Sequence, residues 1–355
     1  MGPALKAHTL RVWDPRTPSV GFTHDTPHPL PSRMRTPRAL AAALAATFLP
    51  AAPVSAADYG PAFQQHWHDG NAELAGYRLT FPRYGEQRQG SAVAITVTEP
   101  FLWEPRVKNE GRPDADGSFG VVKLNLVEDF PTGVYDYNLM TSVFVAAEPV
   151  EGLPAGAVVK NVFSSQEWCG QVFQQATFDD GGVDFESYSY FQREANRDLS
   201  FDADGGSLTE DALFLWARGL AGPAVESGGA VEVPIFRGSV PVRLDHLEPG
   251  WDTATLFRAK DTRKLDTVLG PQTEVRTCRA RITRRAGDDG TPATVEHTFV
   301  VEAAPPHRVI RMTRSDGYDA ELVGVARLPY WSLNGPEGKE KLADFGLKPR
   351  GQLAP

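Results

Sequence analysis

The chain has 355 residues, of which 41% are hydrophobic and 23% charged, and its formal net charge at pH 7 is −9. This length is sufficient for one large domain or two ordinary domains with proper hydrophobic cores. The Lys and Arg residues are interleaved with Asp and Glu rather than gathered into a basic stripe, which excludes a phosphate-tracking surface. We therefore expect a globular protein that has no nucleic-acid partner.

An export signal precedes the region that is expected to fold. Residues 34–38 (MRTPR) carry two arginines, an apolar run follows at 39–49, and small residues stand at Val54 and Ala56. A basic start, an apolar run too short to span a bilayer and a small-residue cleavage site are typical of a secretory signal peptide. We predict that residues 34–56 are this signal peptide and that the mature protein lies in the periplasm or cell envelope.

Residues 1–33 are rich in Pro, Thr, His and Arg and show no apolar periodicity. We interpret them as the product of a start codon assigned too far upstream, or as a disordered extension. After residue 56, no apolar run approaches the length of about 18 residues that a membrane-spanning helix needs. The mature chain is therefore predicted to have no transmembrane segment.

Strand patterns occupy most of the mature chain. Apolar and polar residues alternate at 91–99 and 119–130, as in half-buried strands. Turn sequences rich in Asp and Gly separate the apolar runs and favour antiparallel hairpins. Similar runs predict further strands at 133–147, 157–175, 183–192, 230–236, 239–244, 253–258, 274–285, 294–302, 308–314 and 321–328.

Two short helices interrupt this pattern. The sequence SLTE at 207–210 is a capping box that opens a helix at 208–220, and Asn334 and Gly346 bracket a helix at 336–344. The predicted fold is mainly β, with two antiparallel β-layers or half-barrels joined by a short helix. The predicted regions are an N-terminal β-region at 57–206, a helix plus C-terminal β-region at 207–333, and a C-terminal helix and tail at 334–355.

Short motifs are distributed over the mature chain: WHDGNAEL at 67–74, YRL at 77–79, RYGE at 83–86, TEPF at 98–101 and SSQEWCG at 164–170. Together they resemble a family of uncharacterised exported bacterial β-rich proteins. Some members carry a septum-formation-inhibitor name, but the SxSPRR opening of the nucleotide pyrophosphatases with that name is absent here. The second half, with DAL at 211–213 and Arg218, loosely resembles another uncharacterised exported β-rich family. These resemblances imply export and a β-fold, and they assign no catalytic residue.

The tripeptide Trp168-Cys169-Gly170 begins like a thiol redox site, but such a site needs a resolving cysteine at position 172, which is Val. Strand alternation directs Cys278 toward a core and Cys169 toward a polar side. We therefore expect two separate thiols, and a disulfide formed in an oxidising compartment is the alternative. We expect the Trp168 indole to fill the space between the β-layers.

Further candidates for ligand binding come from two motifs. Arg83 and Glu86, with Arg88 and Glu99, are expected to form a structural ion-pair corner, with a carboxylate-binding site as the alternative. The aromatic run at 185–191 is suited to line a groove between β-layers. The candidate ligand-binding residues are therefore Arg83, Tyr84, Glu86, Glu167, Trp168, Cys169, Tyr188 and Tyr190.

Histidines raise the question of a metal site. His66 and His68 would project to one side if they stood on a strand, and Asp69 could add an oxygen ligand. A further ligand cannot be located from the sequence, so we predict no metal and interpret these three residues as surface residues. His297 alternates with apolar residues and is predicted to be a hydrogen-bonded core histidine.

Two classes of function remain open. The sequence contains no GxSxG, HExxH, P-loop or dinucleotide fingerprint, so no cofactor is expected. This favours a non-catalytic envelope protein that binds an apolar or amphipathic ligand, or a partner protein, on a β-surface. The alternative is a hydrolase that uses Cys169 or scattered carboxylates.

Overall fold

The computed structural model describes residues 59–112, 115–204, 206, 208–285 and 293–349. Within these ranges the fold is mainly antiparallel β with a few short helices, which confirms the predicted fold class. The predicted signal peptide and residues 1–33 lie outside the described residues. No helix in the described ranges has the length and apolar character needed to cross a membrane.

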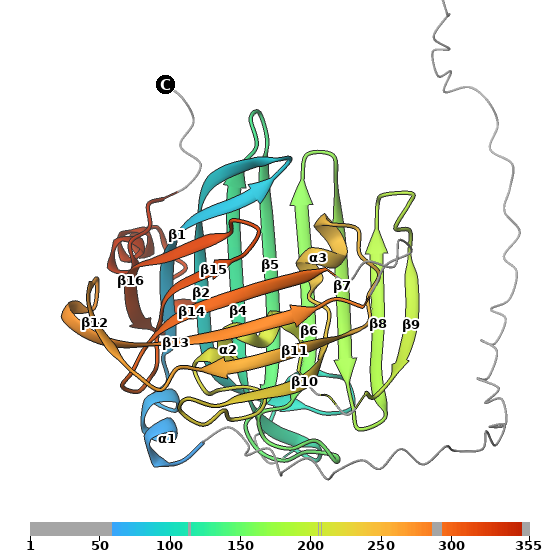
Figure 1. Ribbon diagram of the computed structural model, residues 1–355, viewed down its shortest axis with the longest axis horizontal. Coiled ribbons are helices and arrows are strands. Elements are labelled where there is room, and N and C mark those ends of the chain that lie inside the picture. Colours follow the sequence, from blue (N-terminus) through green and yellow to red (C-terminus); the bar gives the residue numbers. More distant parts are fainter. Residues whose placement is uncertain (1–58, 113–114, 205, 207, 286–292, 350–355) are drawn as a thin grey trace, which may run out of the picture. The chain divides into compact units, whose positions relative to one another are not determined.

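The N-terminal strands form one half of the sheet (Figure 1). They follow the order β1-β2-β4-β5-β6-β7-β8-β9, and the short strand β3 pairs with β2. Each strand pairs antiparallel with its neighbour in this order. Their bounds are β1 (Ala72–Arg83), β2 (Glu86–Leu102), β3 (Val107–Lys108), β4 (Ser118–Pro131), β5 (Asp136–Ala146), β6 (Val158–Glu167), β7 (Gly170–Phe178), β8 (Gly182–Ser189) and β9 (Arg197–Asp202).

The C-terminal strands form the other half, in the order β10-β11-β13-β14-β15-β16, and β12 pairs with β13. The last strand pairs antiparallel with the first one, from Ala72 opposite Leu328 to Thr80 opposite Asp319. The two predicted sets of strands are therefore halves of one continuous sheet. The bounds are β10 (Ala230–Phe236), β11 (Trp251–Arg258), β12 (Arg263–Thr267), β13 (Gly270–Thr283), β14 (Thr294–Glu302), β15 (Val309–Arg314) and β16 (Asp319–Leu328).

One predicted strand is in fact a hairpin. The run at 157–175 was expected to continue through Trp168, but β6 ends at Glu167 and β7 begins at Gly170, so Trp168 and Cys169 form a two-residue turn. The apolar and β-branched residues on both sides look like one strand because hairpin arms share the same alternation. The expectation that Trp168 is buried is therefore wrong, since its side chain is 78% exposed.

The segment at 239–244 was predicted as a strand and is helix α3 (Ser239–Leu244). Val240, Val242 and Leu244 alternate as in a strand, but the helix is favoured by carboxylates that arrive from elsewhere. The backbone N–H of Gly238 donates to Glu210 Oε2 at 3.1 Å, and that of Ser239 donates to Asp211 Oδ2 at 2.9 Å. Carboxylates at the first N–H groups satisfy a helix N-terminus.

The predicted helix at 208–220 is present but shorter. It consists of the 3₁₀ turn η1 (Glu210–Ala212) and helix α2 (Leu213–Ala217). Ser207 of the expected capping box lies outside the described residues, and the Glu210 carboxylate binds Arg284 and His297 instead. This contact confirms the prediction that His297 is a hydrogen-bonded core histidine.

Helix α2 lies between the two halves of the sheet, where strands β10, β11, β13 and β14 cross β4–β7 in Figure 1. Every residue of α2 is buried. Phe214 contacts Tyr77 of β1 with ring centroids 6.2 Å apart, and the Cys278 thiol of β13 donates to the Ala217 carbonyl at 3.8 Å. The space between the layers is therefore filled by the chain itself. Tyr188, expected to line a groove there, is exposed on the side of β8 opposite to the buried Phe185.

Two glycines allow the C-terminal segment to pack on the sheet. Gly76 of β1 and Gly324 of β16 lie opposite each other, and the 3₁₀ helix η3 (Pro336–Phe345) covers them. A Cβ atom at Gly76 would lie 1.9 Å from the Phe345 carbonyl oxygen, so only glycine fits. Gly346, with φ of 78°, ends η3 as the sequence predicted.

The two cysteines are not linked. Cys278 is buried on β13, as its alternation predicted, and Cys169 is exposed on the β6–β7 turn. Both thiols are free, which agrees with the expectation of two separate thiols and contradicts the alternative of a disulfide. One inward and one outward side chain on different parts of the sheet cannot meet without moving the backbone.

Glu128 of β4 supports a prediction about pH. Burial raises the pKa of this carboxyl to about 7, although the hydrogen bond from the Tyr318 hydroxyl, at 2.7 Å, acts in the opposite direction. The folded protein therefore keeps a proton between pH 4.5 and 7 that the unfolded chain releases. The free energy of unfolding should fall as the pH rises through this window, by about 3 kcal/mol in total.

The Glu128→Gln variant should lose this pH dependence of the free energy of unfolding, because a glutamine accepts the same Tyr318 hydrogen bond without titrating. Urea denaturation of both proteins at several pH values in this window measures how the free energy of unfolding of each one changes with pH. At the highest pH of the window the variant should be the more stable protein. Parallel pH profiles for the two proteins would contradict the prediction.

Candidate functional site

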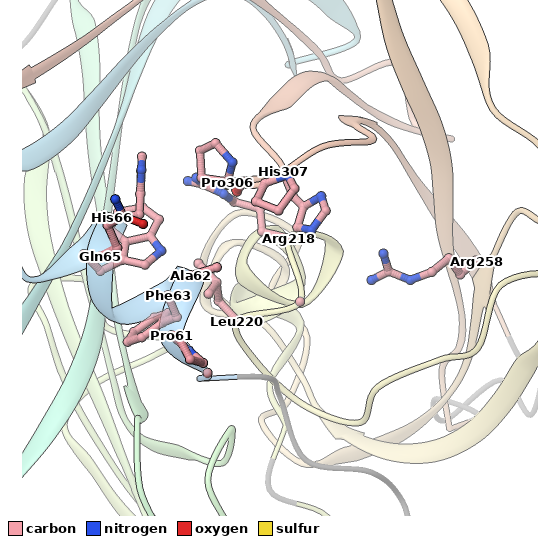
Figure 2. A pocket seen from close by; sticks show the side chains of 14 residues that line it. Pro61, Ala62, Phe63, Gln65, His66, Arg218, Leu220, Arg258, Pro306 and His307 are labelled. Atoms are coloured by element: carbon pink, nitrogen blue, oxygen red, sulfur yellow. Dashed lines mark hydrogen bonds between the residues drawn. The ribbon is translucent and has the colours of Figure 1, made fainter.

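A pocket of about 660 Å³ opens at the end of the fold where helix α1 (Pro61–Trp67) lies beside the end of α2 (Figure 2). This volume is in the range of small-molecule sites. The segment between β14 and β15 and the last residue of β11 complete its wall. The lining residues are Gly60, Pro61, Ala62, Phe63, Gln65, His66, Trp67, Arg218, Gly219, Leu220, Arg258, Pro305, Pro306 and His307.

Helix α1 forms the apolar side of the pocket. Pro61 stands at the first helical position, where its missing N–H group is harmless. Phe63 and Trp67, one turn apart, are both buried and fix the helix to the core. The Tyr59 hydroxyl donates to the Leu220 carbonyl at 2.9 Å and ties the start of α1 to the segment after α2. The apolar wall is therefore preformed.

Arg218 directly follows α2 and is 2% exposed. Its Nη1 lies 2.7 Å from Glu73 Oε1, and its Nη2 donates to the Pro306 carbonyl at 3.1 Å, which joins α2 to the wall formed by the β14–β15 segment. Its guanidinium also lies over the Trp67 ring, 5.1 Å from the centroid. The Nε atom is buried and has no hydrogen-bond partner among the described residues.

Glu73 of β1 balances the charge of Arg218 from outside the pocket lining. Burial raises the pKa of Glu73, but the Arg218 charge and hydrogen bonds from His66 and Arg218 outweigh this effect and lower it to about 2. The carboxylate is therefore ionised at any physiological pH. A buried ion pair of this kind positions Arg218 rigidly, and the desolvation cost of the two charges offsets much of their attraction.

His307 holds a neutral imidazole at the pocket wall. Burial lowers its pKa, and the charges of Arg258 and Arg218 lower it further, against the hydrogen bond with the Glu302 carbonyl. Its Nδ1 lies 3.1 Å from that carbonyl oxygen, so Nδ1 carries the proton and donates it. Nε2 then remains as a hydrogen-bond acceptor.

Arg258, at the end of β11, extends toward the other lining residues in Figure 2. Within the described ranges its guanidinium makes no ion pair or side-chain hydrogen bond. The lining contains Arg218 and Arg258 but no Asp or Glu, although the chain as a whole has a net charge of −9. Because Glu73 balances the charge of Arg218, Arg258 supplies the positive charge that the described lining leaves unpaired, and α1 provides the apolar wall.

Five of the residues predicted from the sequence gather at a different place. Glu167, Trp168, Cys169, Tyr188 and Tyr190 line a shallow groove of about 680 Å³ at the β6–β7 turn. The hydrogen bond with Glu167 and its negative charge raise the pKa of the Cys169 thiol. A raised thiol pKa reduces the thiolate population, which disfavours a nucleophilic role.

The other three predicted residues form a separate corner at the β1–β2 turn. The Tyr84 hydroxyl lies 2.7 Å from that of Tyr137, and Arg83 Nη2 donates to Tyr137 at 3.1 Å. Glu86 pairs with Arg88 at 2.8 Å. The expected ion-pair corner is therefore only partly present: Arg83 binds phenol and carbonyl oxygens, and Glu99 pairs with Lys123. Strand register, which places Glu99 far along β2 from the turn, separates these groups.

The histidines near the start of the described chain lie on α1 and its end, so the strand that would project both imidazoles to one side is not formed here. A proline at the first turn and apolar residues one turn apart favour the helix. His66 faces Arg327 and Glu73, and Asp69 pairs with Arg327 at 2.6 Å. No group of three or more His, Cys, Asp or Glu side chains in the described ranges is arranged to hold a metal ion.

Sequence reasoning missed Arg258, the cation of the pocket that has no ion-pair partner in the described ranges, and the neutral imidazole of His307, and it noted Arg218 only through a resemblance. One signal was present: an arginine directly follows the fully apolar run LFLWA at 213–217. Such an arginine must have a partner in the fold. No local pattern marks Arg258, which ends a strand like many other surface arginines.

Comparison with known proteins finds no relative that suggests a ligand for this pocket. Its ligand is therefore inferred from the lining residues alone. No protein-family model, curated protein sequence or solved structure matches the chain.

Proposed function

We propose that the protein is a non-catalytic binding protein of the cell envelope that holds an amphipathic anion in the pocket between α1, α2 and the β14–β15 segment. The anion is a carboxylate or phosphate monoester with a short apolar chain. The observation that carries this proposal is the guanidinium of Arg258, which has no ion-pair partner among the described residues and lines a pocket where those residues include no Asp or Glu. An anionic head group would supply the missing partner.

The apolar wall supports a ligand with a hydrocarbon part. Phe63, Leu220 and Pro306 line the pocket together with the arginines, so one ligand can contact both kinds of surface. Burial of each methylene group contributes about 0.8 kcal/mol. The head group would therefore decide orientation, and the chain would add affinity.

The lining supports binding rather than hydrolysis. Among the described residues, those that line the pocket include no Ser, Thr, Cys, Lys, Asp or Glu, so neither a nucleophile of the usual kind nor a carboxylate acid or base faces it. Cys169, the candidate nucleophile of the hydrolase alternative, lines the other groove. The predicted signal peptide supports location in the envelope.

Calorimetric titration with octanoate tests the proposal, with octanol as the neutral ligand of matched chain length. The Arg258→Met variant, which keeps the length of the side chain, should bind octanoate at least about tenfold more weakly, because a charge-assisted hydrogen bond contributes about 1.5–3 kcal/mol. Arg258→Lys should retain most of the affinity.

The matched control is Arg281→Met, which removes an exposed arginine of β13 that does not line the pocket and should leave the affinity unchanged. Equal affinity for octanoate and octanol, or an Arg258→Met variant that binds like the wild type, would contradict the proposal.

A further inference from the structure

The groove at the β6–β7 turn carries flat aromatic side chains that the fold leaves uncovered. Trp168 is 78% exposed and Tyr190 is 77% exposed, and Tyr188 also faces solvent. Phe173 extends the same surface, with its ring centroid 6.4 Å from that of Tyr188. A cluster of exposed aromatic residues indicates a binding surface, whereas single exposed aromatic residues are common on protein surfaces and need no explanation.

The backbone holds these rings in place. Trp168 stands on a two-residue turn, in which the Cys169 N–H donates to the Glu167 carboxylate at 2.6 Å. Tyr190 lies against Gly170, where a Cβ atom would approach the ring to 2.7 Å. A larger residue at position 170 would displace the tyrosine. The position of the Tyr190 ring and the backbone of the turn that carries Trp168 are therefore fixed before any ligand arrives.

The loop after β8 is also anchored. The Ser189 hydroxyl donates to Glu194 at 2.7 Å, and Glu194 pairs with the buried Arg243 of α3 at 2.8 Å. The Arg243 guanidinium in turn lies 4.4 Å from the centroid of the Phe191 ring. These contacts fix the segment that presents Tyr190, next to the groove.

The polar part of the lining consists mainly of free amides. Gln166, Gln171 and Asn196 are exposed, and their side chains make no hydrogen bond to any described residue. A side-chain amide both donates and accepts, as a sugar hydroxyl does. The Glu167 carboxylate adds acceptor oxygens, and the described residues that line the groove include no Lys, Arg or His.

We propose that this groove binds a neutral oligosaccharide, whose pyranose rings stack on Trp168 and Tyr190 while the amides and Glu167 bind its hydroxyl groups. The C–H groups on one face of a pyranose carry partial positive charge and suit the negative face of an aromatic ring. The two rings lie on neighbouring hairpin ends, so successive sugar units can contact both.

The charge of the lining favours a neutral oligosaccharide over an anionic lipid surface or a nucleic acid. One carboxylate and no cation would repel an anionic lipid surface or a nucleic acid. The cores of protein interfaces are depleted of glutamate and serine, both of which line this groove. A neutral ligand rich in hydroxyl groups is the class that matches both the aromatic faces and the free amides.

Calorimetric titration of the whole protein with chitohexaose, cellohexaose and maltohexaose tests the proposal. At least one of the three should bind, and Trp168→Ala and Tyr190→Ala should each weaken that binding about tenfold or more, as expected for central aromatic contacts. Trp331→Ala, which removes another exposed tryptophan, should change the affinity by less than about twofold.

Failure of all three oligosaccharides to bind at millimolar concentration would overturn the proposal, and so would a Trp168→Ala variant that binds like the wild type. Sedimentation with phosphatidylglycerol vesicles and sedimentation velocity of the protein alone complete the test. A Trp168-dependent vesicle or self-association signal without sugar binding would assign the surface to a membrane or to a second copy. The Arg258→Met variant should keep its oligosaccharide affinity, so this proposal and the pocket proposal fail separately.

Discussion

Replacing Trp216 with alanine is expected to lower the free energy of unfolding by about 3–5 kcal/mol, the usual cost of deleting a buried tryptophan ring. Trp216 lies on α2 between the two halves of the sheet and is 1% exposed. Its indole N–H donates to the Pro223 carbonyl at 3.2 Å, so the variant also leaves an acceptor without its partner. Burial on both sides leaves little freedom for the surroundings to fill the cavity.

Trp168→Ala is the matched control, because it deletes the same side chain from an exposed turn. Its free energy of unfolding should stay within about 0.5 kcal/mol of the wild-type value. Urea denaturation followed by circular dichroism measures both variants under the same conditions. Equal losses in the two variants would mean that α2 does not lie in the core, and a large loss in Trp168→Ala alone would mean that the β6–β7 turn is buried.

The second large effect is expected from Glu210→Ala, which should lower the free energy of unfolding by about 3 kcal/mol. Glu210 is buried, and its carboxylate accepts from Arg284 Nη1 at 2.7 Å, from Arg284 Nη2 at 2.9 Å and from the Gly238 N–H at 3.1 Å. His297 Nε2 lies 2.9 Å away. Burial raises the pKa of Glu210, but hydrogen bonds from His297 and Arg284 and their charges outweigh it and hold the pKa well below its usual range.

Removal of this carboxylate leaves Arg284 in the core with Asp252 as its remaining acidic partner among the described residues, at 3.0 Å from Nη1. The N–H group of Gly238, the N-cap residue of α3, also loses its acceptor, so the variant should loosen the start of that helix. Thermal and urea denaturation measure the loss, and Glu232→Ala, which removes an exposed carboxylate from β10, serves as the control. A loss in Glu210→Ala no larger than in this control would contradict the buried network.

Strand alternation in the sequence predicted the class of fold and the burial of several individual residues. Cys278 and His297 face the core because side chains alternate with a period of two, a property that each strand has on its own. The same local pattern could not show the turn at Trp168, since both hairpin arms alternate in the same way. It gave the wrong structure for 239–244, because the carboxylates that stabilise α3 come from Glu210 and Asp211, far away in the chain.

The location of the pocket was decided by tertiary structure. Arg218, Arg258 and His307 belong to the end of a helix, the end of a strand and a loop, and they converge because β16 pairs with β1 and brings the two halves of the sheet over α2. The sequence by itself determined that the chain is acidic, β-rich and alternating, since these are properties of composition and of neighbouring residues. The place where Arg218 and Arg258 line one pocket depends on the pairing of strands that are distant in sequence, and no local periodicity encodes that pairing.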